Sequence, residues 1–310
     1  MSATSHILMI RPVHFTFNEQ TAINNSFQTT GFSQDAQTKA LKEFDDFVEL
    51  LRKNKVDVTV ISDTTEPHTP DSIFPNNWIS FHELGNVVLY PMFAENRRLE
   101  RKPIVLETIR QKFLVNNIID LTQHEKNNTY LEGTGSLVLD RDRRIAYACL
   151  SPRTDSALVE EFCSVMDYEP VIFEAKDSRG RSIYHTNVLM CVADKYVVVC
   201  LEAIPDQAQK NAVEAAIFSS GKKLLNINAQ QMNQFAGNML QIKNADGEPL
   251  LIMSSAAYQA LAPEQVITLE AFNRIIHSPL DTIEINGGGS ARCMMAEVFL
   301  EPKLPEQHGN

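Results

Sequence analysis

Apolar residues recur every three or four positions in five separate stretches of the chain. This spacing predicts surface helices that each bury one apolar stripe. The apolar positions are Leu41, Phe44, Phe47, Val48 and Leu51; Leu106, Ile109 and Phe113; Leu158, Phe162 and Val165; Val213 and Ile217; and Leu269, Phe272 and Ile276. The pattern therefore predicts at least five amphipathic helices.

Pairs of short apolar runs lie between these stretches, and a few polar turn residues join each pair. The pairs at 136–150, 187–201 and 238–253 read SLVLDRDRRIAYACL, NVLMCVADKYVVVCL and NMLQIKNADGEPLLIM. Apolar and β-branched runs joined in this way are typical of β-hairpins. A small or amide residue precedes the first strand of each predicted hairpin: Asn77, Gly135, Asn187, Asn238 and Ser290.

These opening residues are regularly spaced along the chain. Successive openings are about 58, 52, 51 and 52 residues apart, a period that indicates internal repeats. About five strand-turn-strand-helix modules fit the length. A closed ring of such modules would hide its sheet edges and gather the openings around one axis. The alternative is an ordinary α/β domain in which the period is accidental.

The composition narrows the classes of partner. The chain has 310 residues, 44% of them apolar, which is enough to bury a large core. A formal net charge of −11 argues against nucleic acid as a partner. No stretch reaches the roughly 18 apolar residues of a membrane helix, and the N-terminus lacks the features of a signal peptide. We therefore expect a cytoplasmic protein without a membrane anchor.

The five cysteines show neither CxxC spacing nor a Cys/His cluster, so we expect no disulfide framework and no metal site. Cys293 lies in NGGGSARCMMAEVF, where small residues let a ligand approach and Arg292 adds positive charge. It is the candidate reactive thiol. The other cysteines lie in apolar strands or a helix, where the thiol usually behaves as an inert hydrophobic group: Cys149, Cys163, Cys191 and Cys200.

A nucleophilic thiol needs a proton acceptor and donor, most often histidine. His185 opens a predicted hairpin two residues before Asn187, so the two side chains are expected on one strand face. Glu132 lies in the Gly-rich segment YLEGTGSLVL, where its carboxylate could orient His185 or bind a substrate N–H group. The loop PDSIFPNNW adds Asp71, Phe74, Asn76 and Asn77. The alternatives are an exposed histidine, a surface glutamate and a plain connecting loop.

Five segments together resemble, in the same order, the guanidine-modifying superfamily of arginine deiminases, dimethylargininases and amidinotransferases. PDSIFPNNW is similar to the dimethylargininase PDSxFxxD segment, and LEGTGS to an E-G-G-D segment. SPRT resembles the S-x-R-T that follows, YHTN an H-x-D pair, and GGGSARCM the deiminase nucleophile segment. The resemblance implies the pentein fold, a five-bladed pseudo-symmetric α/β propeller, as one catalytic domain over residues 1–310.

The resemblance also implies roles for residues at the matching positions. Cys293 would be the nucleophile and His185 the acid and base, with Glu132 beside the planar head group of the substrate. Arg153 would bind the substrate α-carboxylate through its planar pair of donors, and Asp71 the α-amino group. The residues expected to bind substrate are Asp71, Phe74, Asn76, Asn77, Arg153 and Asn187.

The departures from the family pattern bear on the substrate. Deiminases place acidic residues against the guanidinium, where this chain has Asn77 and Asn187, and Gly135-Ser136 replaces the acidic end of E-G-G-D. Amides suit a neutral ureido group, whereas an unpaired buried guanidinium carries a large desolvation cost. We therefore predict hydrolysis of citrulline to ornithine, ammonia and carbon dioxide through a covalent intermediate on Cys293, with no metal or organic cofactor.

Three alternatives remain at this stage. The chain could be a deiminase or dimethylargininase that uses Glu132 as its one acidic head-group ligand, or an amidinotransferase that differs in the final acceptor. From another class, it could be a non-catalytic binder of amino acids. In each case the predicted partner is a small amino acid, and the oligomeric state is not indicated.

Overall fold

Five three-stranded sheets form a ring in the computed structural model, which describes residues 3–29 and 35–304. In each sheet the first strand pairs antiparallel with the second, and the second pairs parallel with the third. The sheets are β3 (Ile79–His82), β4 (Asn86–Leu89) and β5 (Asn117–Asp120); β6 (Val138–Asp140), β7 (Ile145–Leu150) and β8 (Glu169–Glu174); β9 (Met190–Val192), β10 (Tyr196–Val199) and β11 (Lys223–Asn226); β12 (Leu240–Lys243), β13 (Pro249–Ser254) and β14 (Arg274–Ser278); and β15 (Ala296–Glu297), β1 (His6–Arg11) and β2 (Asp57–Ser62). This is the predicted five-bladed α/β propeller.

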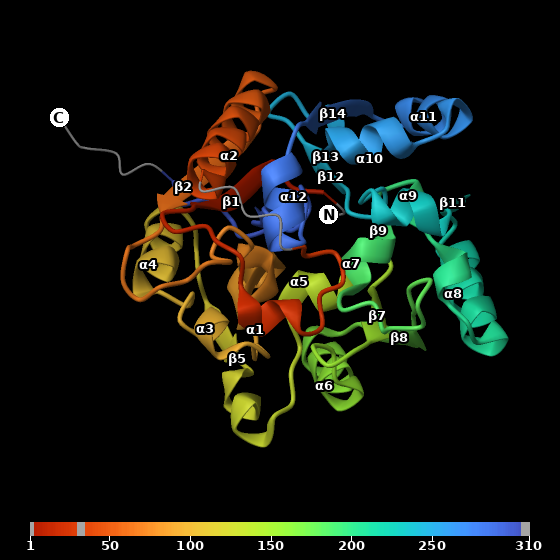
Figure 1. Ribbon diagram of the computed structural model, residues 1–310, viewed down its shortest axis with the longest axis horizontal. Coiled ribbons are helices and arrows are strands. Elements are labelled where there is room, and N and C mark those ends of the chain that lie inside the picture. Colours follow the sequence, from red (N-terminus) through yellow and green to blue (C-terminus); the bar gives the residue numbers. More distant parts are fainter. Residues whose placement is uncertain (1–2, 30–34, 305–310) are drawn as a thin grey trace.

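Helices connect the parallel strands because a parallel pair needs a crossover. They lie at the periphery of the ring (Figure 1). The crossover helices are α2 (Ala36–Lys53), α4 (Pro103–Lys112), α6 (Ser156–Met166), α8 (Gln207–Ser219), and α10 (Ser255–Ala260) with α11 (Pro263–Glu270). Asp155 and Asp206 begin α6 and α8 by accepting hydrogen bonds from backbone N–H groups of the first turn. Each module is therefore strand-strand-helix-strand, one strand longer than predicted.

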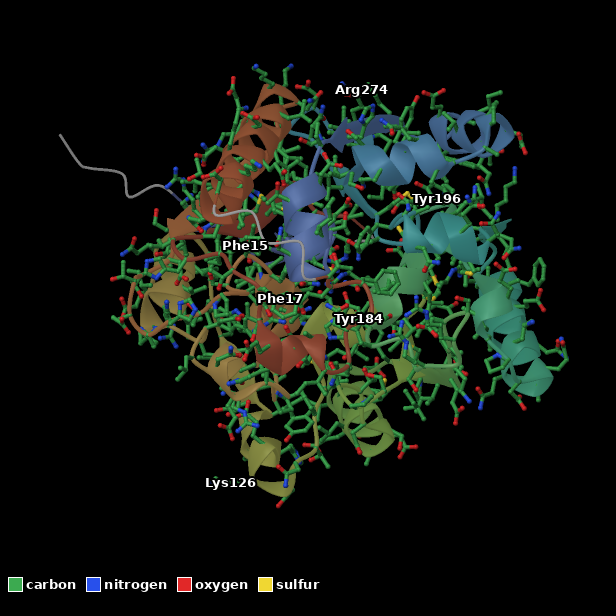
Figure 2. The ribbon with its side chains drawn as sticks, in the orientation of Figure 1. Phe15, Phe17, Lys126, Tyr184, Tyr196 and Arg274 are labelled. Carbon is green, nitrogen blue, oxygen red and sulfur yellow. The ribbon has the colours of Figure 1, made fainter. Side chains whose placement is uncertain are left out.

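Short helical segments precede the first strands of the five sheets. They are η1 (Pro75–Asn77), α5 (Gly133–Ser136), α7 (Thr186–Leu189), α9 (Ala229–Asn233) and α12 (Asp281–Gly287). Figure 1 shows α5, α7 and α12 near its centre, and Figure 2 places Tyr184 there, with Lys126 and Arg274 at the edge. The remaining short helices are α1 (Glu19–Ala22), η2 (Glu83–Gly85), α3 (Glu95–Arg98), η3 (Thr122–Asn127) and η4 (Leu201–Ala203).

The two ends of the chain share one sheet. β15 pairs antiparallel with β1, with Ile7 opposite Glu297 and Leu8 opposite Ala296. The opening at Ser290 therefore leads to a strand whose partner lies near the start of the chain, and the prediction of a fifth local hairpin was wrong. A ring can be closed only by such a pairing, because its first and last modules must meet.

Four of the five predicted helices are present with most of their predicted apolar positions buried or partly buried, and two expectations need correction. α2 buries Phe44, Phe47 and Leu51 as predicted, but Val165 on α6 is 54% exposed. α11 ends at Glu270, and Ile276 lies in β14. Over a short run, an apolar residue next to a helix end fits the helical spacing as well as the alternation of a strand, which has period two. The apolar pattern therefore did not show that Ile276 lies in a strand.

His185 and Asn187 do not share a strand face. His185 has extended backbone angles immediately before α7, and Asn187 lies within that helical turn. Both side chains point towards the ring axis. They do so because of the helical turn α7, and not because they share a strand face as predicted.

Among residues 3–29 and 35–304, no helix combines the length and the apolar character that crossing a bilayer requires.

Candidate active site

Cys293, His185 and Glu132 meet near the ring axis although they come from three separate modules. Glu132 precedes α5, His185 precedes α7, and Cys293 lies in the turn between α12 and β15. All three are at least 97% buried. The Nε2 atom of His185 lies 2.8 Å from Oε2 of Glu132, while His185 and Cys293 line one cavity. The structure thus brings together the three residues predicted to act in catalysis.

The electrostatics of the Glu132–His185 pair set its protonation state. Burial alone would raise the pKa of Glu132, but Arg153 and the hydrogen bond from His185 outweigh burial and hold that pKa below its ordinary value. Burial lowers the pKa of His185, and Glu132 does not restore it. An ionised carboxylate only accepts hydrogen bonds, so the proton of neutral His185 is on Nε2. Its Nδ1 is then free to act as a base.

Two amide nitrogens contact the thiol. Nδ2 of Asn187 lies 3.4 Å and Nδ2 of Asn238 lies 3.3 Å from Sγ of Cys293. Donors aimed at sulfur favour the thiolate over the thiol. Asn187 was a predicted site residue and Asn238 was not.

Arg292 does not supply the positive charge expected beside the thiol. Its guanidinium donates to the carbonyl oxygen of Met295 and to Oε2 of Glu297, both over 2.9 Å. The sequence alone does not show that Arg292 points away from the thiol, because neighbouring side chains in a turn can point in opposite directions.

The other four cysteines are buried in apolar surroundings, as expected. Burial raises the pKa of Cys149 and Cys191 to about 12 and that of Cys163 and Cys200 to about 11. These thiols stay protonated near neutral pH and are poor nucleophiles.

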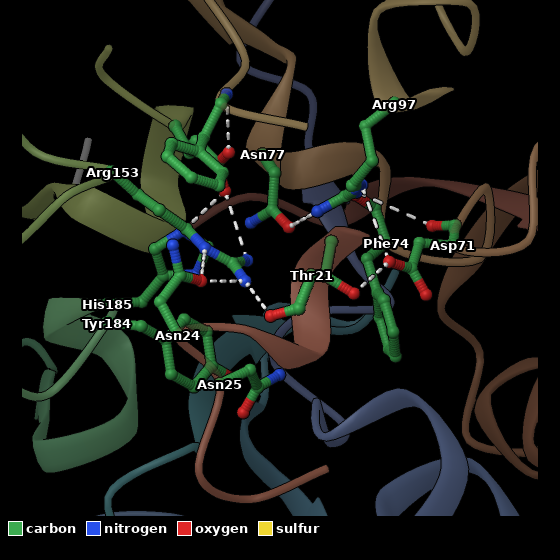
Figure 3. A network of polar contacts seen from close by, with 12 residues as sticks. Thr21, Asn24, Asn25, Asp71, Phe74, Asn77, Arg97, Arg153, Tyr184 and His185 are labelled. Atoms are coloured by element: carbon green, nitrogen blue, oxygen red, sulfur yellow. Dashed lines mark hydrogen bonds and ion pairs between the residues drawn. The ribbon is translucent and has the colours of Figure 1, made fainter. Parts of the chain in front are cut away.

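A narrow cavity adjoins Cys293. It is lined by Thr21, Asn25, Asp71, Phe74, Asn77, Arg97, Arg153, Tyr184, His185, Gly287, Gly289 and Cys293. Figure 3 shows how Arg153 and His185 face Arg97 and Asp71 across it. Charged side chains of both signs line it together with the aromatic rings of Phe74 and Tyr184, an arrangement that suits a small zwitterion.

Arg153 lies at one end of the cavity, under the N-terminal segment. Its Nη2 donates to Oδ1 of Asn24 over 2.6 Å and to the carbonyl oxygen of Thr21 over 2.8 Å (Figure 3). The guanidinium carbon is 4.9 Å from the ring centre of Tyr184. Its Nη1 lies 3.5 Å from Oε2 of Glu132. An amide oxygen, a carbonyl oxygen and a carboxylate thus occupy the donors that were predicted to hold a substrate carboxylate.

Asp71 is positioned to receive a cation. Its Oδ2 accepts a hydrogen bond from Asn18 over 2.8 Å and lies 3.1 Å from Oγ1 of Thr21. Its Oδ1 is buried without a hydrogen-bond partner among the described residues. Burial raises the pKa of Asp71, and Arg97 opposes that shift. A substrate ammonium group would satisfy the free oxygen.

Asn77 is held by Arg97, a buried residue that the sequence did not single out. Nη1 of Arg97 donates to Oδ1 of Asn77 over 2.7 Å. The same guanidinium makes two bonds to Glu100, of 2.9 and 3.0 Å. Arginine has no acceptor atom, so the amide of Asn77 must turn its oxygen to Arg97 and its nitrogen elsewhere.

Asn76 and Phe74 take supporting positions. Asn76 does not line the cavity; its side chain accepts from Asn77 and donates to Thr134. The ring of Phe74 packs against the nucleophile segment, where a β-carbon on Gly287 or Gly289 would approach it to 2.8 or 2.9 Å. The glycines before Cys293 therefore make room for Phe74 as well as for a ligand.

The glycines after Glu132 are needed for close approach. A β-carbon on Gly133 would lie 2.3 Å from the carbonyl oxygen of Asn76, and φ of Gly133 is +48°. One on Gly135 would lie 2.5 Å from Nδ2 of Asn77 and 2.7 Å from Nδ1 of His185. These positions place α5 directly against η1 and α7.

Sequence reasoning missed Asn238, Arg97 and the N-terminal residues Thr21 and Asn24. A signal existed for Asn238, because it opens the fourth module as Asn77 and Asn187 open theirs. The other residues lack a local signal, since only the folded ring brings them to the axis. Within the two described ranges, no three His, Cys, Asp or Glu side chains gather in a way that could hold a metal ion.

A family model described as N,N dimethylarginine dimethylhydrolase, eukaryotic, matches residues 11–300. No functionally curated protein matches the chain. Among solved structures, the chain is similar to ArgZ, an arginine dihydrolase from the ornithine-ammonia cycle in Cyanobacteria, with 21% identity and a TM-score of 0.75 over 98% of this chain. It spans 42% of the length of that ArgZ chain.

Two further solved structures are of similar proteins that carry a bound reaction intermediate or an adduct. An asparagine-to-serine variant of the N-terminal domain of ArgZ, covalently bound to a reaction intermediate, has 21% identity and a TM-score of 0.75, with 97% of this chain and 99% of that one covered. A histidine-to-glycine variant of dimethylarginine dimethylaminohydrolase, in an adduct with S-methyl-L-thiocitrulline, has 14% identity and a TM-score of 0.64, with 95% and 99% covered. At these identities the likeness establishes the fold.

Proposed function

Because this chain belongs to the N,N dimethylarginine dimethylhydrolase family within the guanidine-modifying superfamily, we propose that it hydrolyses citrulline with Cys293 as nucleophile. The products would be ornithine, ammonia and carbon dioxide. The proposal treats residues 1–310 as one catalytic domain, since strands from both ends of the chain share a sheet.

The observation that carries the substrate assignment is the hydrogen bond from Arg97 to Asn77. It turns Nδ2 of Asn77 away from Arg97, where one of its two hydrogens goes to Oδ1 of Asn76 and the other remains as a donor. A ureido group has a carbonyl oxygen that accepts such a donor, whereas a guanidinium has only N–H groups. Across the thiol, Oδ1 of Asn187 is buried without a partner among the described residues. It can accept from the ureido NH₂ group.

The charges around the cavity support the same choice. Arg97 and Arg153 are the cations that line it, and Asp71 is the one carboxylate among the described lining residues. Asp71 is needed for the α-ammonium group, so a second substrate cation would lack a lining anion. Glu132 is already engaged by His185 and by the backbone N–H of Phe93.

The proposed chemistry uses His185 and Cys293 in turn. Neutral His185 takes the thiol proton on Nδ1, and the thiolate attacks the ureido carbon. The imidazolium then protonates the departing amine as the C–N bond breaks, which releases ornithine and leaves a carbamoyl thioester on Sγ. Water deprotonated by His185 adds to the thioester, and the C–S bond breaks with its electron pair returning to sulfur. The released carbamate decomposes to ammonia and carbon dioxide.

The two ends of the amino acid would bind as the sequence predicted. Arg153 would take the α-carboxylate in place of Asn24 and the Thr21 carbonyl, and Oδ1 of Asp71 would take the ammonium group.

The test is to measure ornithine and ammonia released from citrulline, arginine and methylarginines, with Cys293→Ser as the inactive control. Citrulline turnover that is absent in the control supports the proposal. Citrulline formed from arginine would mean a deiminase, and ornithine formed faster from arginine than from citrulline would mean an arginine dihydrolase. Turnover that needs an added amine would mean a transferase, and affinity without a covalent adduct on Cys293 would mean a binder.

A further inference from the structure

Asn238 reaches the nucleophile because the backbone beside it packs very closely against α7. Asn238 lies between α9 and β12, directly after Gly237. A β-carbon on Gly237 would lie 2.3 Å from the carbonyl oxygen of Val188. Only glycine allows this approach. The approach brings a fourth module to the thiol, beside those of Glu132 and His185.

Hydrogen bonds to both Oδ1 and Nδ2 fix the orientation of the Asn238 amide. Oδ1 accepts a hydrogen bond from the backbone N–H of Arg292 over 3.1 Å, and Nδ2 donates to the carbonyl oxygen of Asn187 over 2.9 Å. A rotated amide would place donor against donor and acceptor against acceptor. The second hydrogen on Nδ2 is left for Sγ of Cys293, 3.3 Å away.

Asn187 differs in this respect. Its Nδ2 also points to Sγ, over 3.4 Å, but its Oδ1 has no partner among the described residues. The amide of Asn187 can therefore turn towards a substrate, while that of Asn238 cannot.

We propose that Asn238 is a catalytic residue whose fixed N–H donor stabilises the thiolate of Cys293. Oδ1 of Asn238 lies farther from Sγ, at 3.7 Å. The amide is therefore better placed to donate to a thiolate than to accept from a thiol. Hydrogen bonds to a charged group are stronger than those between neutral groups. This proposal rests on the nucleophilic role of Cys293 in the proposed function.

The donor would act twice in one turnover. It favours the thiolate before attack, and it again favours the thiolate when the C–S bond of the thioester breaks and the electron pair returns to Sγ. Its loss should therefore lower kcat more than it raises KM.

The experiment is the rate of alkylation of Cys293 by iodoacetamide as a function of pH, followed by peptide mass without any substrate. Asn238→Ala removes the donor. Asn238→Asp keeps the shape and replaces the donor by a carboxylate oxygen. Asn228→Ala, at the start of α9, alters the same connecting segment at an exposed residue away from the thiol. Asn238→Asp also adds a negative charge beside the thiol, whereas Asn238→Ala and Asn228→Ala leave the charged and titratable groups around the cavity as they are: Asp71, Arg97, Arg153, Tyr184 and His185.

We expect the pH midpoint of alkylation to rise by about one unit in Asn238→Ala, as for a lost hydrogen bond to a charged group. The rise should be larger in Asn238→Asp, and Asn228→Ala should match the wild type. Unchanged midpoints in both Asn238 variants would overturn the proposal. If the Ala variant fails to fold, Asn238→Leu decides in its place, because leucine fills a similar space without a donor and without a charge. Alkylation needs no turnover, so a wild type inactive on citrulline would refute the substrate and leave this test intact.

Discussion

Nε2 of His185 and Oε2 of Glu132 lie 2.8 Å apart in a region from which solvent is excluded. The carboxylate fixes the proton of the imidazole on Nε2, which leaves the Nδ1 lone pair available as a base. A base whose protonation is set by a buried partner depends on that partner even though the partner need not touch the substrate. The relationship makes Glu132 a positioning residue for His185.

Replacing the carboxylate should therefore disable the base. In Glu132→Gln we expect kcat to fall by about 100-fold or more, the range typical of general acid-base groups, with a smaller change in KM. The pH profile of kcat should also change, because an amide can hydrogen-bond to either imidazole tautomer. Steady-state kinetics on the active substrate measure both effects.

The chain offers a matched control for this prediction. His124 and Glu161 form a similar pair at the surface, with Nε2 and Oε2 3.1 Å apart. Glu161→Gln removes the same charge without reaching the cavity, and its kinetics should equal those of the wild type. A Glu132→Gln protein with wild-type kcat would contradict the positioning role.

The donor on Asn77 should decide between ureido and guanidino substrates. In Asn77→Asp, one carboxylate oxygen would still accept from Arg97 while the other would offer lone pairs to the substrate. We expect kcat/KM for citrulline to fall by about 10-fold to 100-fold, because a donor is lost and an acceptor faces the ureido oxygen. The ratio of arginine to citrulline turnover should rise.

Asn76→Asp is the control for Asn77→Asp, since it places the same charge next door on a residue that does not line the cavity. If both variants shift the substrate ratio equally, net charge rather than the donor on Asn77 explains specificity.

The space at Gly135 should tolerate no side chain. In Gly135→Ala, the new carbon would approach Asn77 and His185 to less than 2.8 Å. We expect kcat to fall by about 100-fold, since displacements of about 1 Å can cost that much. Gly180→Ala is the contrast, because no atom lies within 4 Å of its added carbon and its φ of +75° costs stability only. Full activity in Gly135→Ala would show that η1, α5 and α7 can move apart.

Glu284 should make the stability of the protein depend on pH. It accepts a hydrogen bond of 2.5 Å from Oγ of Ser290, three residues before Cys293. Burial raises the pKa of Glu284 to about 7 in the folded protein, against about 4.3 when unfolded. The folded state therefore holds the proton more tightly, and this contribution to stability is lost as the pH rises through about 7.

Urea unfolding of the wild type and of Glu284→Gln at pH 5 and pH 8 measures this contribution. The glutamine stays neutral, so the wild type should lose up to about 3 kcal/mol relative to the variant between the two pH values. Parallel pH dependence in the two proteins would mean that Glu284 is not buried as a neutral acid.

The repeat and the candidate catalytic residues could be predicted from the sequence because each has a local cause. Apolar spacing reflects one buried face per helix, as on α2, and hairpin patterns reflect short turns, as between β6 and β7. The glycines near Glu132 and Cys293 marked places where backbones come close. Each of these patterns involves only a few neighbouring residues, so it can be recognised without knowledge of the fold.

Only the tertiary structure decided how these pieces meet. It paired β15 with β1, turned Arg292 away from the thiol, and gave the Asn77 amide its direction through Arg97. It also brought Asn238 to Sγ across 55 residues of chain. These contacts join residues far apart in sequence, and their geometry follows from the closure of the ring and from hydrogen bonds that must be satisfied once buried. The sequence by itself determined which groups could react, and the ring determined which atoms face them.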